Sequence, residues 1–348
     1  MTPVIRRLAV RVGLVDSPVT GAHKTHLSAL PYGGGVAIYC GGSCGILGLI
    51  GLSLGDAFGS PASLWGIGVM EIVHVSEALA LFLCASVVFF VGLVDDWIGL
   101  SPLLRLLAQI AAAAALVLGV PGFILPLAPS IPLVAPLATM LWIVAVTNAF
   151  NFLDNMDGLV AGMSVIAFAS IGVIALWSPH FGGLVLSLSL AGASAGFLIF
   201  NFPRASIFMG DSGGLFLGFS AAGLTALLSR HLGEISAPPS PWPHLLAPLL
   251  ILLVAAYDQL TVVALRLYKG NAPWLGDTNH VSHRLVRLGL SRRSAVLLIH
   301  GLVALSGALA LWVLMLSPES AWKLLGASAA ILILLGMLDW AAVRRRER

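Results

Sequence analysis

The sequence predicts an all-α polytopic membrane protein, for three reasons. First, 59% of its 348 residues are hydrophobic and only 9% are charged, whereas about 25% of an average soluble chain is charged. Second, the apolar runs are long and repeated, with short polar loops between them, which is typical of helical membrane proteins. Third, the sequence lacks the short alternating segments that a transmembrane β-barrel requires.

Ten apolar runs are long enough to cross a bilayer as helices. They lie at about 34–54, 77–95, 103–120, 132–152, 159–177, 183–202, 207–229, 243–266, 295–316 and 320–343. The preceding segment, Met1–Pro31, has no run of this length and no apolar region of a signal peptide. We therefore treat residues 1–348 as one membrane domain with an even number of spans.

The basic residues favour one orientation for these spans. When the loops are numbered alternately, every Lys and Arg except Arg230 and Lys323 falls on the N-terminal side. Basic residues are enriched in cytoplasmic loops, so this side is predicted to be cytoplasmic and the membrane to be the plasma (inner) membrane. The net charge of +3 does not by itself indicate a nucleic-acid partner, and the distribution of charge between the loops is more informative.

The fourth predicted span ends in an unusually polar stretch, Thr147–Leu159. Charged groups at membrane depth cost roughly 2.5–3.5 kcal/mol each on insertion scales. In a continuing helix Asn148, Asn151 and Asp154 recur every third residue and share one face, and Asp157 extends that row. The stretch is consistent with a polar helix end in a cytoplasmic turn. A polar active-site edge is favoured because similar clusters occur in other loops.

Those other clusters all fall on the same predicted side of the membrane. They are His23-Lys-Thr-His26, Pro31-Tyr-Gly-Gly-Gly35, the pair Asp95-Asp96, Arg204 with Phe208-Met-Gly-Asp-Ser-Gly-Gly214, Asp258, and a loop with Asp277, Asn279, His280 and His283. The opposite loops, such as Ala237–Pro243, are plain connectors. The chemistry is therefore expected at one membrane face.

Carboxylates, amides and glycines gathered at one face suit Mg²⁺, which commonly uses one or two carboxylates together with substrate phosphates. Glycine turns such as Gly33–Gly35 let a backbone approach a phosphate closely. The cations that could pair with phosphate charge are Lys24, Arg204 and Arg284. The residues thus indicate phosphoryl transfer with a lipid-facing partner, and they name neither substrate.

Adjacent carboxylates at Asp95 and Asp96 repel each other unless a metal or a proton lies between them, so one of them is a candidate base. His280 and His283 fit either a metal pair or contacts to a phosphate. Gly210-Asp-Ser-Gly-Gly214 is similar to a chymotrypsin-like nucleophile segment, but that fold is a soluble β protein.

An ion-coupled transporter is the alternative from another class of protein, because acids within a membrane also mark ion pathways. Its site would lie near the bilayer midplane, often between repeats, whereas these acids crowd one face.

In chain order the polar segments are Asp16, His23-Lys-Thr-His26 and Pro31-Tyr-Gly-Gly-Gly35; Val94-Asp-Asp-Trp-Ile-Gly-Leu-Ser-Pro102 with Arg105 and Gln109; Asn148-Ala-Phe-Asn-Phe-Leu-Asp-Asn-Met-Asp-Gly-Leu159; Phe208-Met-Gly-Asp-Ser-Gly213; and Asp258 with Asp277 and His280-Val-Ser-His283-Arg284-Leu285. This set resembles the polyprenyl-phosphate N-acetylhexosamine-1-phosphate transferases of glycosyltransferase family 4. The resemblance covers about residues 14–290.

The resemblance implies transfer of a HexNAc-1-phosphate, most plausibly GlcNAc-1-phosphate, from a UDP-sugar to polyprenyl (undecaprenyl) phosphate. UMP is released, and Mg²⁺ is required, with Mn²⁺ as the other candidate ion. This reaction would begin a cell-envelope glycan at the bilayer. A homodimer is left open.

The resemblance also assigns roles to residues. Asp211 matches a metal-ligand aspartate. Asp95 and Asp96 match a pair near the lipid phosphate, with Asp95 as the candidate base. Asn151, Asp154 and Asp157 match the nucleotide and metal pocket, with Asp154 counted among both the catalytic residues and the metal ligands. The other expected substrate contacts are Lys24, Asn148, His280, His283 and Arg284.

The sequence departs from the family pattern in two places. The last motif of the family commonly runs His-x-His-His, and here Ser282 replaces its middle histidine. This change argues against the phospho-N-acetylmuramoyl-pentapeptide transferase branch, which remains the alternative within the family. Family members also begin with a span before the Asp16 segment, and Thr2-Pro3 resembles the end of such a helix.

Overall fold

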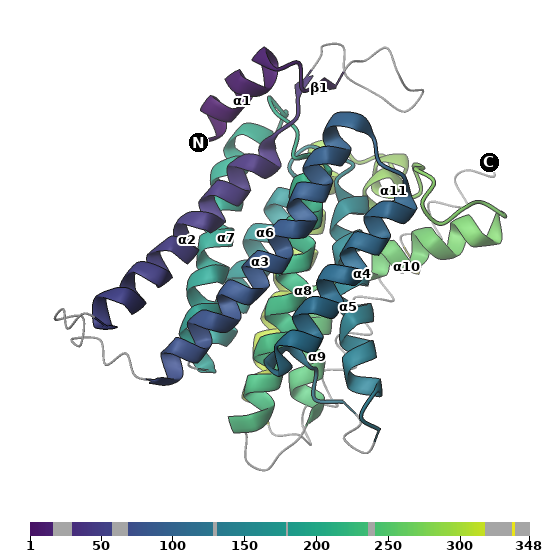
Figure 1. Ribbon diagram of the computed structural model, residues 1–348. Helices are drawn as coiled ribbons and strands as arrows, with labels where there is room; N and C mark the ends of the chain where they lie inside the picture. The colour runs from purple at the N-terminus through teal and green to yellow at the C-terminus, as the bar shows by residue number, and fades with distance from the viewer. Residues whose placement is uncertain are drawn as a thin grey trace.

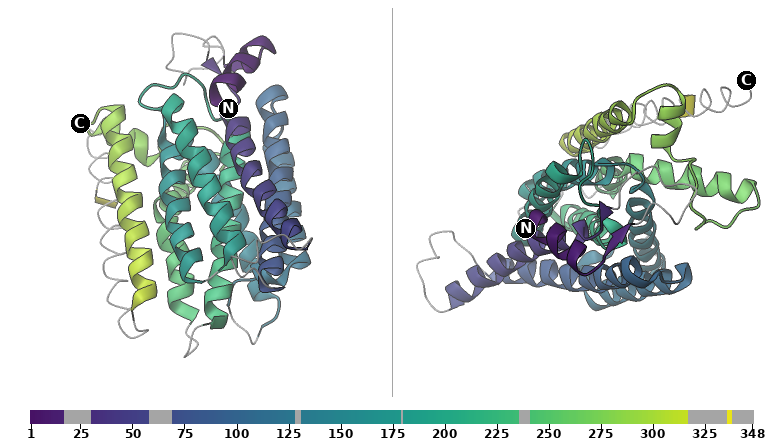
Figure 2. Two further views of the ribbon diagram at one scale, coloured as in Figure 1. Left: turned by 90° about the vertical axis from the view of Figure 1, so that its left-hand side faces the viewer. Right: turned by 90° about the horizontal axis from the view of Figure 1, so that it is seen from above.

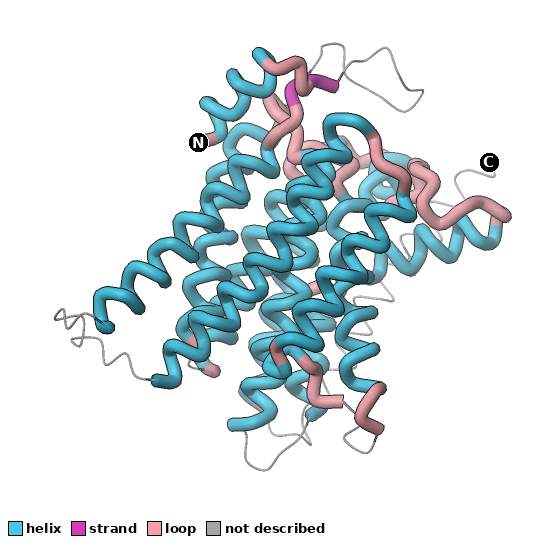
Figure 3. Tube along the Cα trace, viewed as in Figure 1, coloured by secondary structure: helices cyan, strands magenta, loops and turns pink. Residues whose placement is uncertain are grey.

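The computed structural model describes residues 1–16, 30–57, 69–127, 131–178, 180–235, 241–316 and 336–337. Helices dominate this part of the chain (Figures 1 and 3). Its strands are β1 (Val15–Asp16) and β2 (Leu30–Pro31), which form one short antiparallel pair. The predicted all-α class is confirmed.

Eight of the described helices are long and apolar enough to cross a membrane. They are α2 (Gly34–Ala57), α3 (Val69–Ile98), α4 (Pro102–Gly119), α5 (Val134–Leu153), α6 (Leu159–Trp177), α7 (Phe181–Asn201), α8 (Gly210–Ile235) and α12 (Arg292–Met315). Each coincides with a predicted span, so the polytopic architecture is confirmed. The predicted span at 320–343 and the candidate Lys24 lie outside the described residues.

The predicted span at 243–266 is not straight. It is divided into α9 (Pro241–Ile251) and α10 (Leu253–Tyr268), which are bent by 70° relative to each other. Pro248 lies inside α9, one turn before the bend. Proline has no N–H for the helix ladder and its ring crowds the preceding turn, so helices bend near it. As a result α10 projects sideways from the bundle (Figures 1 and 2).

Helix α8 occupies the centre of the bundle and packs against α2, α3 and α5. Small residues at its start allow the closest approaches. A Cβ placed on Gly92 of α3 would lie 2.7 Å from the backbone of Ser212, and one placed on Gly35 of α2 would lie 2.8 Å from the Cα of Gly213. Side chains such as Phe216 and Phe219 fill the core below this crossing.

Three shorter helices complete the described fold, namely α1 (Thr2–Arg11), η3 (Pro121–Phe123) and α11 (Val281–Arg287). Helices α1 and α11 lie at the upper end of the bundle in Figure 1. That end also contains the last turns of α3, α5 and α7 and the first turns of α8 and α12. The polar clusters of the sequence therefore come from elements that terminate together.

Candidate active site

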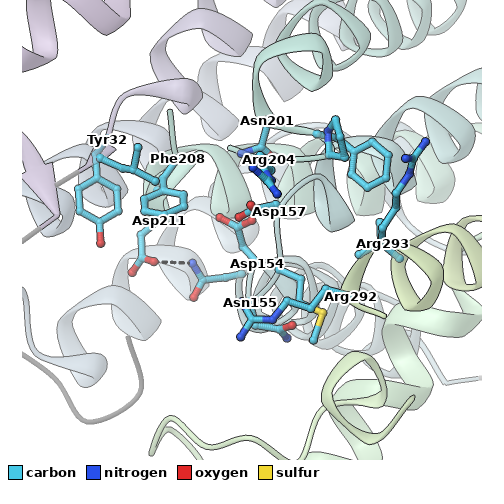
Figure 4. Close-up of a pocket in the computed structure, with 17 residues that line it drawn as sticks. Tyr32, Asp154, Asn155, Asp157, Asn201, Arg204, Phe208, Asp211, Arg292 and Arg293 are labelled. Carbon is cyan, nitrogen blue, oxygen red and sulfur yellow. Dashed lines mark hydrogen bonds between the residues drawn. The ribbon is translucent and has the colours of Figure 1, made fainter. Parts of the chain in front are cut away.

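A cavity of about 610 Å³ opens at this end of the bundle. Its charged lining residues are Asp154, Asp157, Asp211, Arg204, Arg292 and Arg293. Figure 4 shows Asp211 at one side and Arg293 at the other, with Asp154 and Asp157 between them in this view. Anionic and cationic groups thus line one space.

Asp211 lies in the first turn of α8. Its Oδ1 accepts a hydrogen bond from Asn151 Nδ2 at 3.0 Å, and its Oδ2 forms an ion pair with Arg105. One third of the side chain (33%) remains exposed. The carboxylate is therefore held on one side by an amide and a guanidinium and open to the cavity on the other, as a ligand-binding group must be.

Asp95 and Asp96, at the end of α3, have different partners. Asp95 accepts hydrogen bonds from Arg105 at 2.7 Å and from the backbone N–H of Leu100 at 2.5 Å. Asp96 accepts from the N–H of Asp211 at 2.6 Å, and from the N–H (3.2 Å) and hydroxyl (2.7 Å) of Ser212. Asp96 thus caps the start of α8, where a negative charge is favourable.

These contacts bear on the roles predicted for the pair. Neither Asp95 nor Asp96 is among the residues that line the cavity. Asp96 holds the helix turn that carries Asp211, so it can support the site without contacting substrate. The catalytic role of Asp95 as a base stays a prediction.

Asp154 follows the last residue of α5 and lines the cavity. Among the described residues its carboxylate has no hydrogen-bond partner. Burial raises the pKa of Asp154 to about 7, and the nearby charges of Asp96 and Asp157 add to that rise. A half-buried carboxylate without a partner is a favourable place for a cation, because a positive ligand would relieve both the burial and the repulsion.

Asp157 and Asn201 hold the loop that follows α7. Asp157 accepts a hydrogen bond from the N–H of Ala205 at 2.9 Å. Asn201 accepts from the N–H of Gly158 at 2.7 Å and donates to the carbonyl of Ile207 at 2.9 Å. Gly158 has φ of 74°, a conformation that favours glycine. These bonds position the loop that brings Arg204 to the cavity.

Asn155, Asn201, Arg292 and Arg293 line the cavity but were not predicted as site residues from the sequence. The two arginines open α12, whose first turn is capped by the Ser291 hydroxyl accepting from the N–H of Ser294 at 3.1 Å. The loop-charge pattern predicted both arginines on the same side as the other polar clusters without indicating the cavity. Asn201 gave a weak signal, as a polar residue at the end of an apolar span.

His280 and Arg284 are buried in a network around Asp258, which is 0% exposed. Asp258 Oδ2 lies 2.7 Å from His280 Nδ1, and its Oδ1 accepts from the N–H of Val281 at 2.6 Å. Arg284 lies 3.9 Å from the same carboxylate. The structure thus directs both predicted substrate contacts inward, and neither lines the cavity.

Two further groups extend this Asp258 network, which we define as Asp258, His280, Arg284, Arg266 and Asp277. Arg266 reaches Asp277 at 3.3 Å. Burial opposes ionisation of Asp277, but hydrogen bonds from Arg266 and Asn279 outweigh it and lower its pKa. The network is therefore closed by internal ion pairs and hydrogen bonds.

His283 is half-buried beside this network, with its ring centroid 6.4 Å from that of His280. Burial, His280 and the charges of Arg292 and Arg287 lower the pKa of His283 to about 4, against an opposing effect of Asp258. His283 is thus a neutral imidazole near pH 7.

The remaining predicted contacts have internal partners as well. Asn148 donates to Gln109 Oε1 at 2.6 Å, between α5 and α4, and does not line the cavity. The glycines that begin α2 also have another role than the expected approach to phosphate. Gly34 and Gly35 donate their N–H groups to the carbonyls of Phe208 and Met209 at 2.9 and 2.8 Å. They are required because α2 and the start of α8 lie in contact.

The donor set fits a hard divalent cation. No three His, Cys, Asp or Glu side chains converge as metal ligands in the part of the chain that the structure describes. Mg²⁺ does not need such a cage, because one or two carboxylates with substrate phosphates and water suffice. Asp154 and Asp211 offer those carboxylates, both at the cavity.

The similarity to known proteins agrees with this arrangement. Residues 78–229 match the model of glycosyl transferase family 4. The chain is 32% identical to a probable undecaprenyl-phosphate N-acetylglucosaminyl 1-phosphate transferase of Bacillus subtilis, over 86% of this chain and 77% of the relative. It is 33% identical to decaprenyl-phosphate N-acetylglucosaminephosphotransferase of Mycolicibacterium smegmatis, over 87% and 77%.

A third relative is the undecaprenyl-phosphate alpha-N-acetylglucosaminyl 1-phosphate transferase of Escherichia coli K12. It is 30% identical over 84% of this chain and 75% of its own length. The chain therefore belongs to glycosyltransferase family 4, as the resemblance of its motifs predicted.

Proposed function

We propose that this protein transfers N-acetylglucosamine 1-phosphate from UDP-N-acetylglucosamine to a polyprenyl phosphate, giving a polyprenyl-diphosphate sugar and UMP. The observation that carries the proposal is the cavity in which Asp154, Asp157 and Asp211 face the same space as Arg204, Arg292 and Arg293. The names of the three relatives support the acceptor class and the sugar.

The chemistry requires that several negative charges meet. An oxygen of the acceptor phosphate attacks the sugar-bearing phosphorus of the nucleotide diphosphate. A new P–O bond forms, and the bond from that phosphorus to the bridging oxygen of UMP breaks. Arg204, Arg292 and Arg293 supply positive charge for the phosphate oxygens on one side of the cavity.

The carboxylate side of the cavity would hold the cation. Asp154 and Asp211 are the residues that would bind Mg²⁺, which when bound would neutralise charge on the diphosphate. Asn151 and Arg105 orient the Asp211 carboxylate through the contacts described above. Asp96 keeps the first turn of α8 in place and so keeps Asp211 at the cavity.

The test is reconstitution with purified protein, radiolabelled UDP-GlcNAc and undecaprenyl phosphate, with and without Mg²⁺. Labelled lipid and stoichiometric UMP are expected, and both should disappear when the cation is chelated. UDP-GalNAc and UDP-MurNAc-pentapeptide serve as alternative donors. Turnover of the pentapeptide donor alone would overturn the sugar assignment and favour the peptidoglycan branch.

The same proposal places the cavity on the cytoplasmic side of the plasma membrane, in agreement with the charge asymmetry. Two positions form a matched pair. Glu234 lies in the last turns of α8, which begins at the cavity, and Lys269 directly follows α10. In a variant without native cysteines, Glu234→Cys should react with an impermeant thiol reagent on intact cells. Lys269→Cys should not, and labelling of Lys269→Cys alone would invert the orientation.

A homodimer is also part of the proposal. The mass of the purified protein in detergent or in nanodiscs, measured by light scattering and corrected for bound detergent and lipid, would distinguish a dimer from a monomer.

A further inference from the structure

Ser282 stands where the family pattern commonly has a histidine, and it has a specific contact here. Its side chain is 0% exposed at the start of α11. The hydroxyl donates to Oδ1 of Asn155 at 2.6 Å, across a separation of 127 residues. Asn155 lies in the loop after α5 and lines the cavity. The bond therefore connects α11, which lies beside the closed Asp258 network, to the wall of the open cavity.

Two contacts determine which way the Asn155 amide faces. Oδ1 accepts from Ser282, and Nδ2 donates to the carbonyl of Phe152 at 3.2 Å. Rotation of the amide by half a turn would place Oδ1 against the Phe152 carbonyl, so two acceptors would face each other. Among the described residues the second Nδ2 hydrogen has no partner. Asn155 therefore has one donor to offer at the cavity.

The charge of the cavity identifies what such a donor would bind. Arg204, Arg292 and Arg293 line the same space, and Figure 4 shows Asn155 beside Arg292 in that view. An anionic oxygen is the group that guanidinium and amide donors share as a partner. An amide turned the other way would present Oδ1 and repel that oxygen.

We propose that Ser282 is a positioning residue that holds the Asn155 amide with Nδ2 toward the cavity, where it binds a phosphate oxygen of the nucleotide sugar. This inference rests on the proposed function. Ser282 touches no substrate itself and acts through Asn155. Its contribution therefore falls on the affinity for the nucleotide, not on the rate of the chemical step.

Ser282→Ala tests this role. The Michaelis constant for UDP-GlcNAc and the dissociation constant for UDP should rise about 3- to 10-fold, the range expected for one lost hydrogen bond. The turnover number should stay within about twofold, because the reacting groups are untouched. Ser282→Thr keeps the hydroxyl and should restore the affinity for UDP.

Ser187→Ala is the matched control. Ser187 is also 0% exposed, and its hydroxyl donates to the carbonyl of Gly183 at 2.6 Å within α7, away from the cavity. Loss of that hydroxyl should leave the affinity for UDP unchanged. Equal effects of Ser187→Ala and Ser282→Ala on UDP affinity would overturn the positioning role, as would unchanged affinity in folded Ser282→Ala.

Substitutions at Asn155 keep the inference testable where Ser282→Ala does not fold. Asn155→Asp retains an acceptor for Ser282 and replaces the donor by a negative oxygen, so UDP should bind more weakly than to Asn155→Ala. In the Asn155→Ala background, Ser282→Ala should have no further effect on UDP affinity. Wild-type affinity in Asn155→Asp, or full additivity of the two alanine changes, contradicts the proposal.

The outcomes distinguish a failure of the proposed transfer reaction from a failure of the role assigned to Ser282. A wild-type protein that forms no lipid product and binds no UDP overturns the proposed function together with this inference. A wild-type protein that is active, with Asn155 variants of normal affinity, overturns the role of Ser282 alone.

Discussion

Two groups of aspartates lie at the same end of the bundle and differ in what their oxygens face. Asp258 is fully buried, and its oxygens contact His280, the N–H of Val281 and Arg284. Asp154 lines the cavity and has no hydrogen-bond partner among the described residues. Both groups contain the residue types that bind metals and phosphates.

The difference shows that partners, not residue types, decide what a polar group at membrane depth does. In the Asp258 network the charged groups are paired with one another inside the protein and connect α10 to α11, so removing one partner would leave a buried charge without compensation. At the cavity Asp154 has no such partner among the described residues, so a ligand can offset the cost of burying its charge. Each group can be tested with substitutions that should affect stability or activity, but not both.

The largest effect is expected from Asp258→Ala. Removing one partner of a buried ion pair leaves charge without compensation and typically costs about 3–5 kcal/mol. The unfolding temperature of the detergent-purified protein should fall steeply, while turnover per folded molecule at low temperature should be retained. Asp258→Asn, which keeps an acceptor for the N–H of Val281, should lose less. An unchanged unfolding temperature with lost turnover would move this network into the active site.

Asp211→Asn should do the opposite. Turnover should fall about 10²- to 10³-fold, the usual cost of removing one group that stabilises charge in the transition state, and the Mg²⁺ requirement should rise. The unfolding temperature should change little, because asparagine keeps the acceptor for Asn151. Glu234→Gln, at the other end of α8, is the control. Normal activity of Asp211→Asn would show that the cavity is not the reacting site.

A smaller effect is expected from Arg293→Gln at the cavity edge. The Michaelis constant for UDP-GlcNAc should rise about 3- to 10-fold at low ionic strength, as for one exposed charge-assisted hydrogen bond. The difference from the wild type should shrink in high salt, since salt screens exposed charges. Arg287→Gln, outside the cavity lining, should show neither change. A salt-independent rise would point to a structural effect.

The smallest effect concerns pH and His283. Its folded-state pKa of about 4 lies below the usual 6.5. Between these values the unfolded chain binds more protons, so stability must rise with pH across that window. The unfolding temperature of the wild type should be lower at pH 5 than at pH 7.5, and His283→Gln should reduce this difference by about 2–4 °C. An unchanged difference would mean that His283 is charged and faces an anion.

The sequence was sufficient for the class of fold and for much of the cavity. Hydropathy locates the spans, because each must cross the same thickness of lipid. Asn151, Asp154 and Asp157 line the cavity as predicted, but the continuing helical face was wrong. Helix α5 ends at Leu153, so Asp154 and Asp157 lie in the turn that follows it, and Asn148 faces Gln109 instead. Asp211 lines the cavity as well, as its motif predicted.

The sequence could not distinguish polar residues that line the cavity from polar residues that pair with one another in the Asp258 network. The partner of His280 lies 22 residues earlier in the chain, and Asn201 holds a glycine 43 residues earlier. Such pairings depend on how helices pack, and no local spacing encodes them. For the same reason the glycines at 33–35 suggested a phosphate loop, whereas in the structure Gly34 and Gly35 allow close contact between the start of α2 and the start of α8.

The central position of α8 has a consequence for how the protein is made. Its most apolar window is entirely buried in protein, and its mean hydropathy of 1.4 is the lowest among the eight spans described. On leaving the ribosome such a segment gains little from lipid alone. Helices α2, α3 and α5, which pack against it, precede it in the chain, whereas α9, which also packs against it, follows. Much of the wall around α8 is therefore synthesised before α8 itself, and α8 can enter the membrane against protein that is already there.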